Sequence, residues 1–400
     1  MKAGWEIKTL DEVCIVERGS SPRPIKEFFT TEPDGVNWIK IGDTEEGGKY
    51  VFSTRQKITP EGAKQSRYVK EGDFILTNSM SFGRPYIMKT DGYIHDGWFV
   101  LRLKDSIDAD YFYHLLSSNL IQEQFTQLAA GAIVKNISGD LVKKAVLPIA
   151  PLPEQKRLVT LLDEAFESIA TAKANAQQNL KNARALFESH LNEVFTKRGE
   201  GWIENTKPLA DLCELIVDCE HKTAPTQEEG IPSIRTPNIG KGKLLLDGVY
   251  RVSEETYKEW TRRAEPQAGD LILAREAPAG NVAIIPENIK VCLGQRTVLI
   301  RPSRNVFEPE FLTLMLLQPQ MQQKLLAHSR GATVQHVNMK DIRALNVGEI
   351  PSLSIQKDIV AVMNNLTEET QHLEALYSRK IAALNELKKA LLHRAFSGEL

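Results

Sequence analysis

Apolar residues recur at intervals of three and four along two long segments of the chain, 152–195 and 353–396. Neither segment contains glycine or proline beyond its second residue. This spacing is typical of a helix that buries one stripe against another helix. We therefore predict two helices of roughly 44 residues, or about 66 Å each at the α-helical rise. Their seam is expected to contain Leu158, Leu162, Phe166, Ile169, Leu180, Leu191, Ile359, Met363, Leu366, Leu373, Leu384 and Leu391.

The two segments begin alike, with Leu152-Pro-Glu-Gln-Lys156 in the first and Leu353-Ser-Ile-Gln-Lys357 in the second. Helices of this length are uncommon inside a single globular domain. Because the pattern is written twice, the natural packing partner of each helix is its own repeat in the same chain.

The duplication extends beyond the helices. Leu10-Asp-Glu-Val-Cys14 corresponds to Leu209-Ala-Asp-Leu-Cys213, and Glu71-Gly-Asp-Phe-Ile-Leu76 to Ala268-Gly-Asp-Leu-Ile-Leu273. Gly131-Ala-x-Val134 likewise corresponds to Gly331-Ala-x-Val334. Anchors shared in one order indicate a duplicated chain. We expect a first globular domain at 1–151, a central helix at 152–198, a second globular domain at 199–351 and a C-terminal helix at 352–400.

Each globular segment is rich in short β-type runs bounded by turn residues. These runs are 36–41, 73–77 and 98–103 in the first segment, and 271–274, 282–285 and 296–300 in the second. Helical periodicity occurs near 110–128 and 310–327. The fold class is therefore α+β, with each domain built on a bent or barrel-like antiparallel sheet with helices. Gly72-Asp73 and Gly269-Asp270 are interpreted as turns that precede a central strand.

The composition is that of a globular protein, with 42% hydrophobic and 26% charged residues and a formal net charge of −2. Acidic and basic residues nearly balance in each of the four segments, so none is a basic block that binds phosphates strongly by itself. A nucleic-acid function would therefore depend on local patches or on a partner. Because there is no signal-peptide core and no apolar run of about 20 residues, we expect a cytoplasmic protein.

The four cysteines form no CxxC pair. Cys213-x5-Cys219-x-His221 has the residue types of a metal corner, but a fourth ligand is not evident. The expectation is free thiols and no metal.

Catalytic motifs are missing from the sequence. There is no glycine-rich loop with dinucleotide-site spacing, no G-x-x-x-x-G-K-[ST] phosphate loop and no Asp/Asn-Pro-Pro-aromatic tetrapeptide. Glu154-Gln-Lys156 has the form of a nuclease tail, but its counterpart Ile355-Gln-Lys357 lacks the carboxylate, which favours a helix start. His95, His221, His328 and His336 are scattered and form no triad pattern. We expect neither an active site nor a cofactor.

The repeated scaffold carries loops of different chemistry. Arg18-Gly-Ser-Ser-Pro-Arg23 stands where the second copy has Asp218-Cys-Glu-His-Lys-Thr223, and Thr77–Arg84 stands against Ala274–Asn281. This is expected when two copies of one fold bind different ligands. Arg and Lys suit guanine edges and Asn suits adenine edges, whereas the alternative is that these loops are merely solvated. The candidate DNA-contact residues are Arg18, Ser20, Ser21, Arg23, Lys40, Asn78, Ser79, Arg84, Lys135, His221, Lys222, Thr223, Arg235, Asn238, Arg275 and Arg296.

The full-length pattern resembles the specificity subunit of type I restriction-modification systems. The resemblance rests on the two Gln-Lys helix starts, the preceding Pro148-Ile-Ala-Pro-Leu-Pro153, and Ala395-Phe-Ser-Gly398 at the end. Arg18-Gly-Ser-Ser-Pro22, Val36-Asn-Trp-Ile-Lys-Ile-Gly42 and Gly131-Ala-x-Val134 resemble features of a target-recognition domain.

The resemblance implies two similar target-recognition domains joined by two long antiparallel coiled-coil helices with pseudo-two-fold symmetry. Each domain would read one half of a bipartite, asymmetric DNA target. The helices would space the domains and dock two modification subunits, which methylate adenine, and two restriction subunits would complete the complex. The chain itself would be noncatalytic and would need no cofactor. The alternative is a coiled-coil scaffold that binds two protein partners without contacting DNA.

Overall fold

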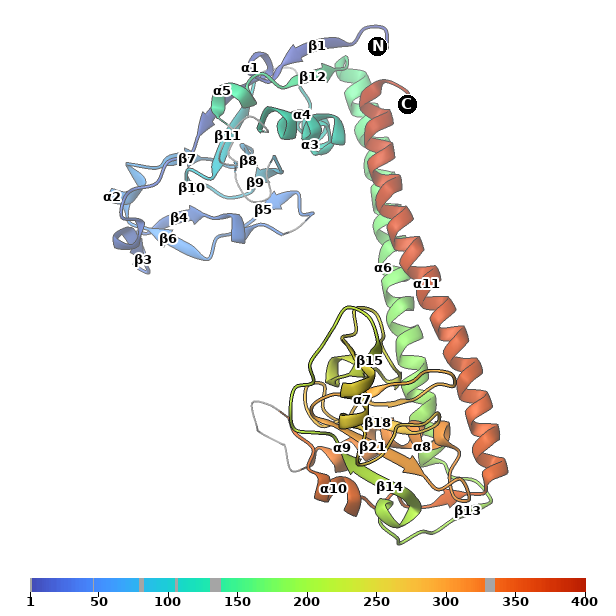
Figure 1. Cartoon of the computed structure of the whole chain (residues 1–400). Coiled ribbons are helices and arrows are strands. Elements are labelled where there is room, and N and C mark those ends of the chain that lie inside the picture. The colour runs from blue at the N-terminus through green and yellow to red at the C-terminus, as the bar shows by residue number, and fades with distance from the viewer. Residues whose placement is uncertain (1, 46, 79–82, 105–106, 130–137, 328–334) are drawn as a thin grey trace. The chain divides into compact units, whose positions relative to one another are not determined.

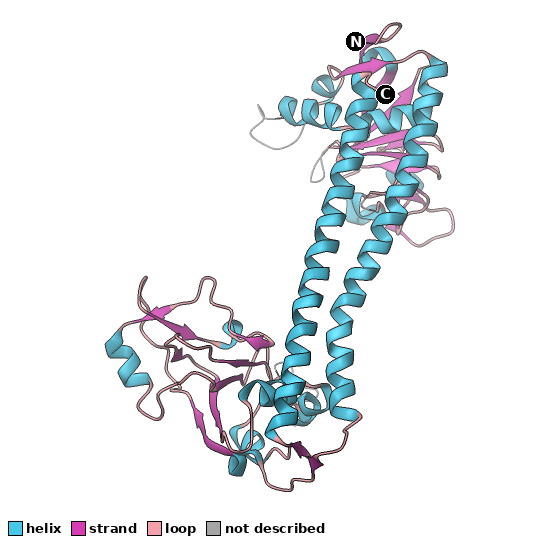
Figure 2. Cartoon of the chain, turned by 90° about the vertical axis from the view of Figure 1, so that its right-hand side faces the viewer, coloured by secondary structure: helices cyan, strands magenta, loops and turns pink. Residues whose placement is uncertain are grey.

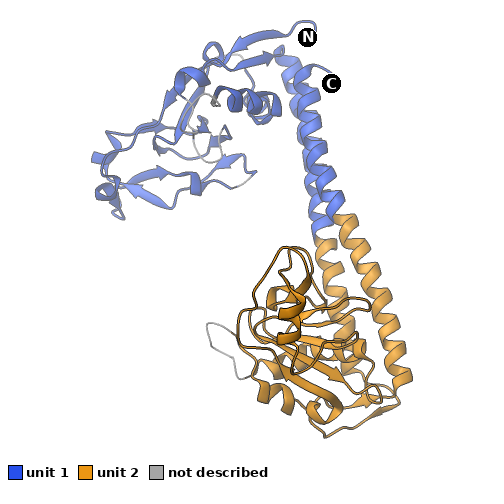
Figure 3. Cartoon of the chain, in the orientation of Figure 1, with its two compact units in different colours: residues 1–177, 378–400 blue, residues 178–377 orange. Residues whose placement is uncertain are grey.

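The computed structural model describes residues 2–45, 47–78, 83–104, 107–129, 138–327 and 335–400. The chain forms two compact units (Figure 3): unit 1 comprises residues 1–177 and 378–400, and unit 2 comprises residues 178–377. Each unit contains one globular domain together with part of both long helices. Among the described residues, none of the helices is long and apolar enough to cross a membrane.

Unit 1 begins with a globular domain of short strands and helices (Figure 1). Its strands are β1 (Glu6–Thr9), β2 (Cys14–Arg18), β3 (Phe29–Thr30), β4 (Val36–Ile39), β5 (Tyr50–Val51), β6 (Gln56–Ile58), β7 (Arg67–Val69), β8 (Phe74–Thr77), β9 (Pro85–Met88), β10 (Gly92–Ile94), β11 (Trp98–Leu103) and β12 (Val146–Ile149). Its helices are α1 (Leu10–Val13), α2 (Pro60–Ala63), α3 (Ala109–Ser117), α4 (Asn119–Ala129) and α5 (Gly139–Val142).

The strands of unit 1 form two five-stranded sheets and a two-stranded ribbon. The orders are β2-β11-β8-β9-β5, β3-β6-β4-β10-β7 and β1-β12. Most pairs are antiparallel, but β5 pairs with β9 and β4 with β10 in parallel. The expectation of an antiparallel sheet was therefore wrong at these two pairs. Several intervening strands separate the members of each pair in the sequence, which lets the chain re-enter the sheet in the same direction.

The core of unit 1 joins the sheet, the helices and both long helices. Phe74 of β8 packs edge-on against Phe112 of α3, with ring centroids 5.1 Å apart. On the other side of α3, Tyr111 packs edge-on against Phe396, with centroids 5.3 Å apart. One hydrophobic cluster thus includes the sheet, α3, Leu158 and Leu162 from the central helix, and Phe396 from the C-terminal helix. Burial of such large side chains stabilises the domain on the helix pair.

Unit 2 repeats this plan. Its strands are β13 (Trp202–Ile203), β14 (Cys213–Asp218), β15 (Ile231–Ile234), β16 (Gly242–Lys243), β17 (Arg251–Val252), β18 (Leu271–Ala274), β19 (Val282–Ile284), β20 (Cys292–Leu293), β21 (Thr297–Pro302) and β22 (Ile350–Pro351). Its helices are α7 (Glu254–Trp260), α8 (Pro309–Leu317), α9 (Pro319–Leu325) and α10 (Met339–Ala344). The central sheet has the order β14-β21-β18-β19-β16, which matches β2-β11-β8-β9-β5 strand for strand. The structure therefore confirms the duplication inferred from the sequence.

The long helices are α6 (Leu152–Thr196) and α11 (Leu353–Ser397), each ending one residue beyond the last position of its apolar pattern. They run side by side within each unit (Figure 2). In unit 1, Lys173 bonds to Asn385 at 2.9 Å, while Phe166, earlier in α6, lies under Lys388, later in α11. Because one number rises as the other falls, the pairing is antiparallel. Arg184 and Glu374 connect the helices in unit 2 at 3.3 Å.

The expected seam positions all lie against protein rather than open solvent. Leu158, Leu162, Ile169, Leu191 and Met363 are buried, and the other seven are partly buried. Near the end of α11 the most buried side chains are Leu392, Ala395 and Phe396, next to the expected Leu391. The stripe shifts there because the helix packs on the globular domain as well as on α6.

The Gly-Asp pairs are structural turns, as predicted. Asp73 is 4% exposed and accepts a hydrogen bond from Arg102 Nε at 3.1 Å. Asp270 is 2% exposed and accepts bonds from Arg301 at 2.7 and 2.8 Å. Each carboxylate also binds a backbone N–H three residues earlier, which closes the turn before β8 or β18.

Candidate nucleic-acid interface

The strands that lead into the two variable loops of each unit finish at the same end of the central sheet. In unit 1, β2 ends at Arg18, which lies opposite Phe99, and β8 ends at Thr77, which lies opposite Trp98. In unit 2, Asp218 at the end of β14 pairs with Val298, and Ala274 at the end of β18 pairs with Thr297. The antiparallel pairing of these strands therefore places the starts of both loops at the same end of the sheet in each unit.

In unit 1 the loop side chains surround Asp96. The Ser21 hydroxyl donates to Asp96 Oδ1 at 3.0 Å, Arg18 Nε donates to the Asp96 carbonyl at 3.3 Å, and Arg23 lies 3.6 Å from Oδ2. Partial burial acts to raise the pKa of the Asp96 carboxyl, but the Ser21 hydrogen bond and the nearby positive charge lower it below its ordinary value. The Arg23 side chain is 82% exposed, so its guanidinium is available to an incoming ligand.

Gly19 lets this loop pass close to the neighbouring backbone. A Cβ at this position would lie 2.0 Å from the carbonyl oxygen of His95, so any other residue would displace the loop. His95 itself is packed between Trp38 and Trp98, with ring centroids 6.1 and 6.2 Å away, and burial lowers its pKa. The Arg-Gly-Ser motif is therefore fixed by close packing of the loop.

Several candidate residues of unit 1 support the loop rather than project from it. Asn78 is 1% exposed and donates from Nδ2 to the Asp96 carbonyl at 3.3 Å, which corrects its expected place on the surface. Ser20 donates to the Gln65 carbonyl at 3.0 Å, and Lys40 lies over the Phe29 ring at 5.1 Å. Arg84 is partly buried. Ser79 and Lys135 lie outside the described residues.

In unit 2 the corresponding place is occupied by a charged network centred on Arg275. Its NH1 bonds to Asp218 Oδ2 at 2.7 Å, its Nε donates to the Val337 carbonyl at 3.0 Å, and its NH2 contacts His336 Nε2 at 3.1 Å. The side chains of Arg275 and Asp218 are 13% and 17% exposed. All three nitrogens of the guanidinium are thus engaged internally, so Arg275 positions the loops instead of reaching outward.

Arg296 is the exposed arginine of this network. Its side chain is 64% exposed and its NH1 lies 2.7 Å from Glu276 Oε2, while His336 Nδ1 contacts the other oxygen of Glu276 at 3.0 Å. The backbone of Arg296 is left-handed, with φ of 63°. A non-glycine residue rarely adopts this conformation, and such strain is concentrated at functional sites.

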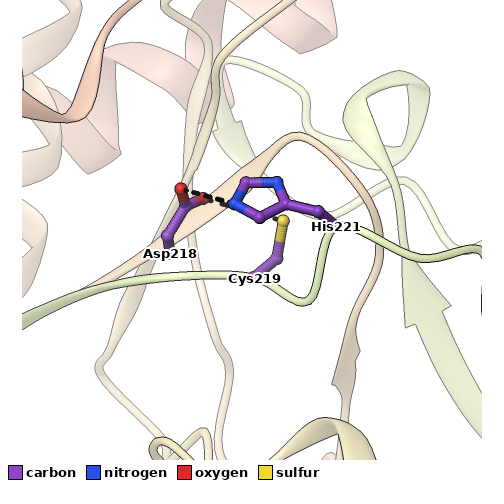
Figure 4. Close-up of side chains that lie close together, drawn as sticks. All are labelled: Asp218, Cys219 and His221. Atoms are coloured by element: carbon purple, nitrogen blue, oxygen red, sulfur yellow. Dashed lines mark hydrogen bonds and ion pairs between the residues drawn. The ribbon is translucent and has the colours of Figure 1, made fainter.

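Asp218, Cys219 and His221 lie together at the end of β14 (Figure 4). His221 Nε2 is 3.3 Å from Asp218 Oδ2, the oxygen that Arg275 also binds. Cys219 is 1% exposed, and burial raises the pKa of its thiol. A protonated thiol and a carboxylate already paired with arginine make a poor cation site. Cys213, at the start of β14, lies at the other end of this strand.

The remaining candidates of unit 2 differ in exposure. His221, Lys222 and Thr223 are exposed, and Arg235 is exposed over the Tyr250 ring at 5.2 Å. Asn238 instead closes a turn, accepting from the Arg235 backbone N–H at 3.1 Å and donating to the Leu245 carbonyl at 3.2 Å. The exposed members are cationic and polar side chains, and Gln295, the residue before Arg296, donates to the His221 carbonyl at 3.3 Å.

Both halves of the chain match one known protein family. Residues 2–182 and 200–381 each match the type I restriction modification DNA specificity domain. The chain belongs to this family. It is 24% identical over 420 residues to the EcoBI specificity subunit from Escherichia coli, a match that covers 99% of this chain and 86% of the relative. It is 21% identical over 423 residues to the MjaIX specificity subunit from Methanocaldococcus jannaschii, covering 99% and 93%.

Solved structures related to this specificity-domain family have the same fold. The HsdS subunit from Thermoanaerobacter tengcongensis superposes with a TM-score of 0.63 at 21% identity, covering 100% of this chain and 98% of that chain. A chain from a solved type I R-M system, described with its complex assembly and conformational transition, gives a TM-score of 0.79 at 20% identity, covering 100% and 99%. The two-domain, two-helix plan implied by the resemblance is therefore confirmed.

The sequence did not reveal the acidic and histidine partners of the arginines. Asp96 binds the loop that contains Ser21, and Asp218 and His336 hold Arg275 from 57 and 61 residues away in the chain. No local pattern in this specificity-domain sequence connects residues so far apart. The only available signal was positional, because both loops occupy matching places in the two copies.

Proposed function

We propose that this chain is the DNA-specificity subunit of a type I restriction-modification system and carries no active site of its own. One observation supports this most directly. Two specificity domains of one family have chemically different loop clusters at the equivalent end of their central sheets. A repeated scaffold with changed loops is what reading two different half-sites requires.

The proposed recognition domains are residues 1–151 and 199–351, with the long helices between and after them. Because α6 and α11 each contribute residues to both units, we propose that the helix pair sets the spacing between the half-sites. A stiff spacer suits a target whose two specific halves are separated by nonspecific base pairs.

The proposed DNA contacts are side chains of the two loop clusters. In unit 1 they come from the exposed Arg18 and Arg23 and the partly exposed Ser21, with Ser20, Lys40, Arg84, Ser79 and Lys135 as further candidates. In unit 2 they come from His221, Lys222, Thr223, Arg235 and Arg296. Asn78, Asn238 and Arg275 are proposed to position the loops. Arginine with its free edge toward a groove suits guanine O6 and N7.

The partners we propose are double-stranded DNA, two modification subunits and, in the complete complex, two restriction subunits. The net charge of −2 is consistent with this division, because a chain with no excess of positive charge makes few phosphate contacts by itself. Specific base contacts from this chain and most phosphate contacts from the modification subunits would together give tight binding.

Binding to duplex DNA tests this proposal. Fluorescence anisotropy with a library of duplexes should show weak, salt-sensitive binding by the chain alone and tight, sequence-dependent binding once modification subunits are added. The scaffold alternative predicts a stable complex with protein partners in which the chain adds no sequence preference. That result would overturn the DNA-specificity function.

A further inference from the structure

Unit 2 contains a cavity between its globular domain and the long helices. Its volume is about 730 Å³, within the range of small-molecule sites. Apolar side chains of Phe187, Leu191, Leu314 and Leu317 form part of the lining. Polar side chains from α8 and α11, including Glu310, Thr313 and Asn364, form another part. None of the candidate DNA-contact residues lines it.

The same position of unit 1 can be located residue by residue. Helices α3 (Ala109–Ser117) and α8 (Pro309–Leu317) have the same length and place in the fold, so Asp110, Tyr113 and His114 correspond to Glu310, Thr313 and Leu314. Helices α6 and α11 begin at Leu152 and Leu353, so Asp163 and Phe166 correspond to Asn364 and Thr367.

The strand at the rim of the cavity also has its counterpart. Tyr50 of β5 pairs in parallel with Ile87, which lies opposite Phe74 of β8. Lys243 of β16 pairs in parallel with Ile284, which lies opposite Leu271 of β18. Because Phe74 and Leu271 both begin the strand after the Gly-Asp turn, Lys49 in unit 1 corresponds to Gly242 in unit 2.

Unit 1 fills this position with its own cation and aromatic rings. Lys49 Nζ lies 2.6 Å from Asp110 Oδ1 and 5.1 Å from the centre of the Tyr113 ring. His114 bonds to Asp163 at 2.7 Å and packs edge-on against Phe166, with ring centroids 5.5 Å apart. An ammonium held by a carboxylate and an aromatic face is a favourable pairing in a partly dry site.

Unit 2 lacks counterparts of Lys49, Tyr113 and Phe166 but retains their surroundings. Of the cationic side chains that line the cavity, Arg184 pairs with Glu374 and Lys241 with Glu188, while Lys243 stands in place of Tyr50. Gly242, Thr313 and Thr367 stand in place of Lys49, Tyr113 and Phe166, and all three line the cavity. The carboxylate that matches Asp110 is still present as Glu310. Glu310 Oε2 accepts a long hydrogen bond of 3.4 Å from Asn364 Nδ2. Phe187 supplies an aromatic wall from α6.

We propose that this cavity binds an aromatic group that carries a positive charge, with the cation on Glu310 and the ring against Phe187 and Leu314. The ligand would provide the positive charge and the aromatic ring that Lys49 and Tyr113 provide in unit 1. Ion pairing at Glu310 and a cation–π contact would fix its orientation, and the apolar lining would bury its ring. This inference does not depend on the proposed DNA function.

Tyramine, which joins a phenol ring to an ammonium, tests the site on the full chain by calorimetry and saturation-transfer NMR. 4-Ethylphenol, which lacks the charge, is the matched probe. Tyramine should bind saturably, and Glu310→Gln should weaken it about tenfold while leaving 4-ethylphenol unchanged, because only the charged bond is lost. Glu287→Gln, in an exposed loop, should change neither.

Refilling the cavity provides a second test. Thr313→Tyr restores the ring of Tyr113 and should abolish tyramine binding, with the fold checked by circular dichroism. The absence of saturable tyramine binding to the wild-type chain would overturn the proposal. Binding that is unaffected by Glu310→Gln would overturn it as well, whether or not Thr313→Tyr folds.

A positively charged aromatic group could come from two sources. One is a free aromatic amine, and the other is a lysine or arginine next to an aromatic residue of a partner polypeptide. Tyramine titration of the complex with modification subunits distinguishes them. Loss of tyramine binding in the complex assigns the cavity to a partner side chain, whereas unchanged affinity assigns it to a small molecule. Both outcomes support the site, since each requires that the isolated chain binds the probe.

Discussion

Gln155 Oε1 accepts a hydrogen bond from the backbone N–H of Asp108 at 2.8 Å, immediately before α3. Gln155 Nε2 donates to the Ala150 carbonyl at 2.7 Å, and the side chain is 1% exposed. In unit 2, Gln356 makes the equivalent bond with the Glu308 N–H at 2.9 Å. The repeated glutamine therefore fastens each long helix to the globular domain that precedes it.

Removal of this glutamine should loosen the domain from its helix. Gln155→Ala removes the partners of the partly buried Asp108 N–H and the buried Ala150 carbonyl, and we expect a loss of about 2–4 kcal/mol in the unfolding free energy of unit 1. Hydrogen exchange of peptides from α3 would measure it. Lys156→Ala, at an exposed neighbouring position, should change stability by less than about 0.5 kcal/mol. Equal protection in both variants would refute the anchoring role.

Substitutions in the helix seam should lower the unfolding free energy by an amount that increases with the burial of the residue. Leu162 is 1% exposed within the core cluster of unit 1, whereas Leu384 is partly exposed. Leu162→Asp should therefore destabilise by about 4 kcal/mol, because it buries an unpaired charge, and Leu384→Asp by about 1–2 kcal/mol. Thermal unfolding checks the order, with Leu376→Asp, 43% exposed, as the control. A reversed order would show that the seam is misplaced.

Acid should weaken unit 1 through His114. Burial lowers its pKa below the ordinary 6.5, and the bond to Asp163 only partly offsets this. The unfolded chain then binds more protons than the folded one, so stability is present above pH 6.5 and is lost as the pH falls below it.

The natural counterpart of His114 in unit 2 is Leu314, which makes His114→Leu a suitable variant. Asp163 is 51% exposed and stays solvated when its partner is removed. The variant should flatten the decline in unit 1 stability between pH 7 and pH 5, measured by urea unfolding at each pH. His95, whose pKa is also lowered by burial, contributes to the remaining slope. An unchanged slope would show that His114 does not contribute to the pH dependence of unit 1 stability.

Substitutions of the two arginines of the unit 2 network should have different effects, one on stability and the other on DNA recognition. Arg275→Met leaves the partly buried Asp218 carboxylate without its arginine partner and should cost about 3 kcal/mol in stability. Arg296→Ala should leave the unfolding curve unchanged and weaken DNA binding by the complex about tenfold, with relaxed preference at one base pair. Anisotropy and urea unfolding of both variants check this. An Arg296 variant that retained full discrimination would contradict its assignment.

Periodic and repeated features were predictable from the sequence because local spacing encodes them. The ends of α6 and α11, the matching strand order and the turn function of Asp73 and Asp270 follow from apolar period, duplication and turn chemistry. The function of Gln155 did not follow, since its partner Asp108 is 47 residues away and contributes only a backbone N–H.

Loop side chains were less predictable for the same reason. Residue type alone favours Asn78 and Arg275 as base readers, but tertiary partners hold both inside. The filled position in unit 1 and the cavity in unit 2 also arise from side chains on separate elements, such as Lys49 with Tyr113. Their difference emerges only when the two units are compared element by element.

The central claim is that each domain reads one half of a bipartite target. The most direct measurement is methylome sequencing of cells whose chain carries residues 1–151 exchanged for those of another family member. The account predicts that one half of the methylated sequence changes, while the other half and the spacer length are retained. A change in both halves, or in neither, would contradict it.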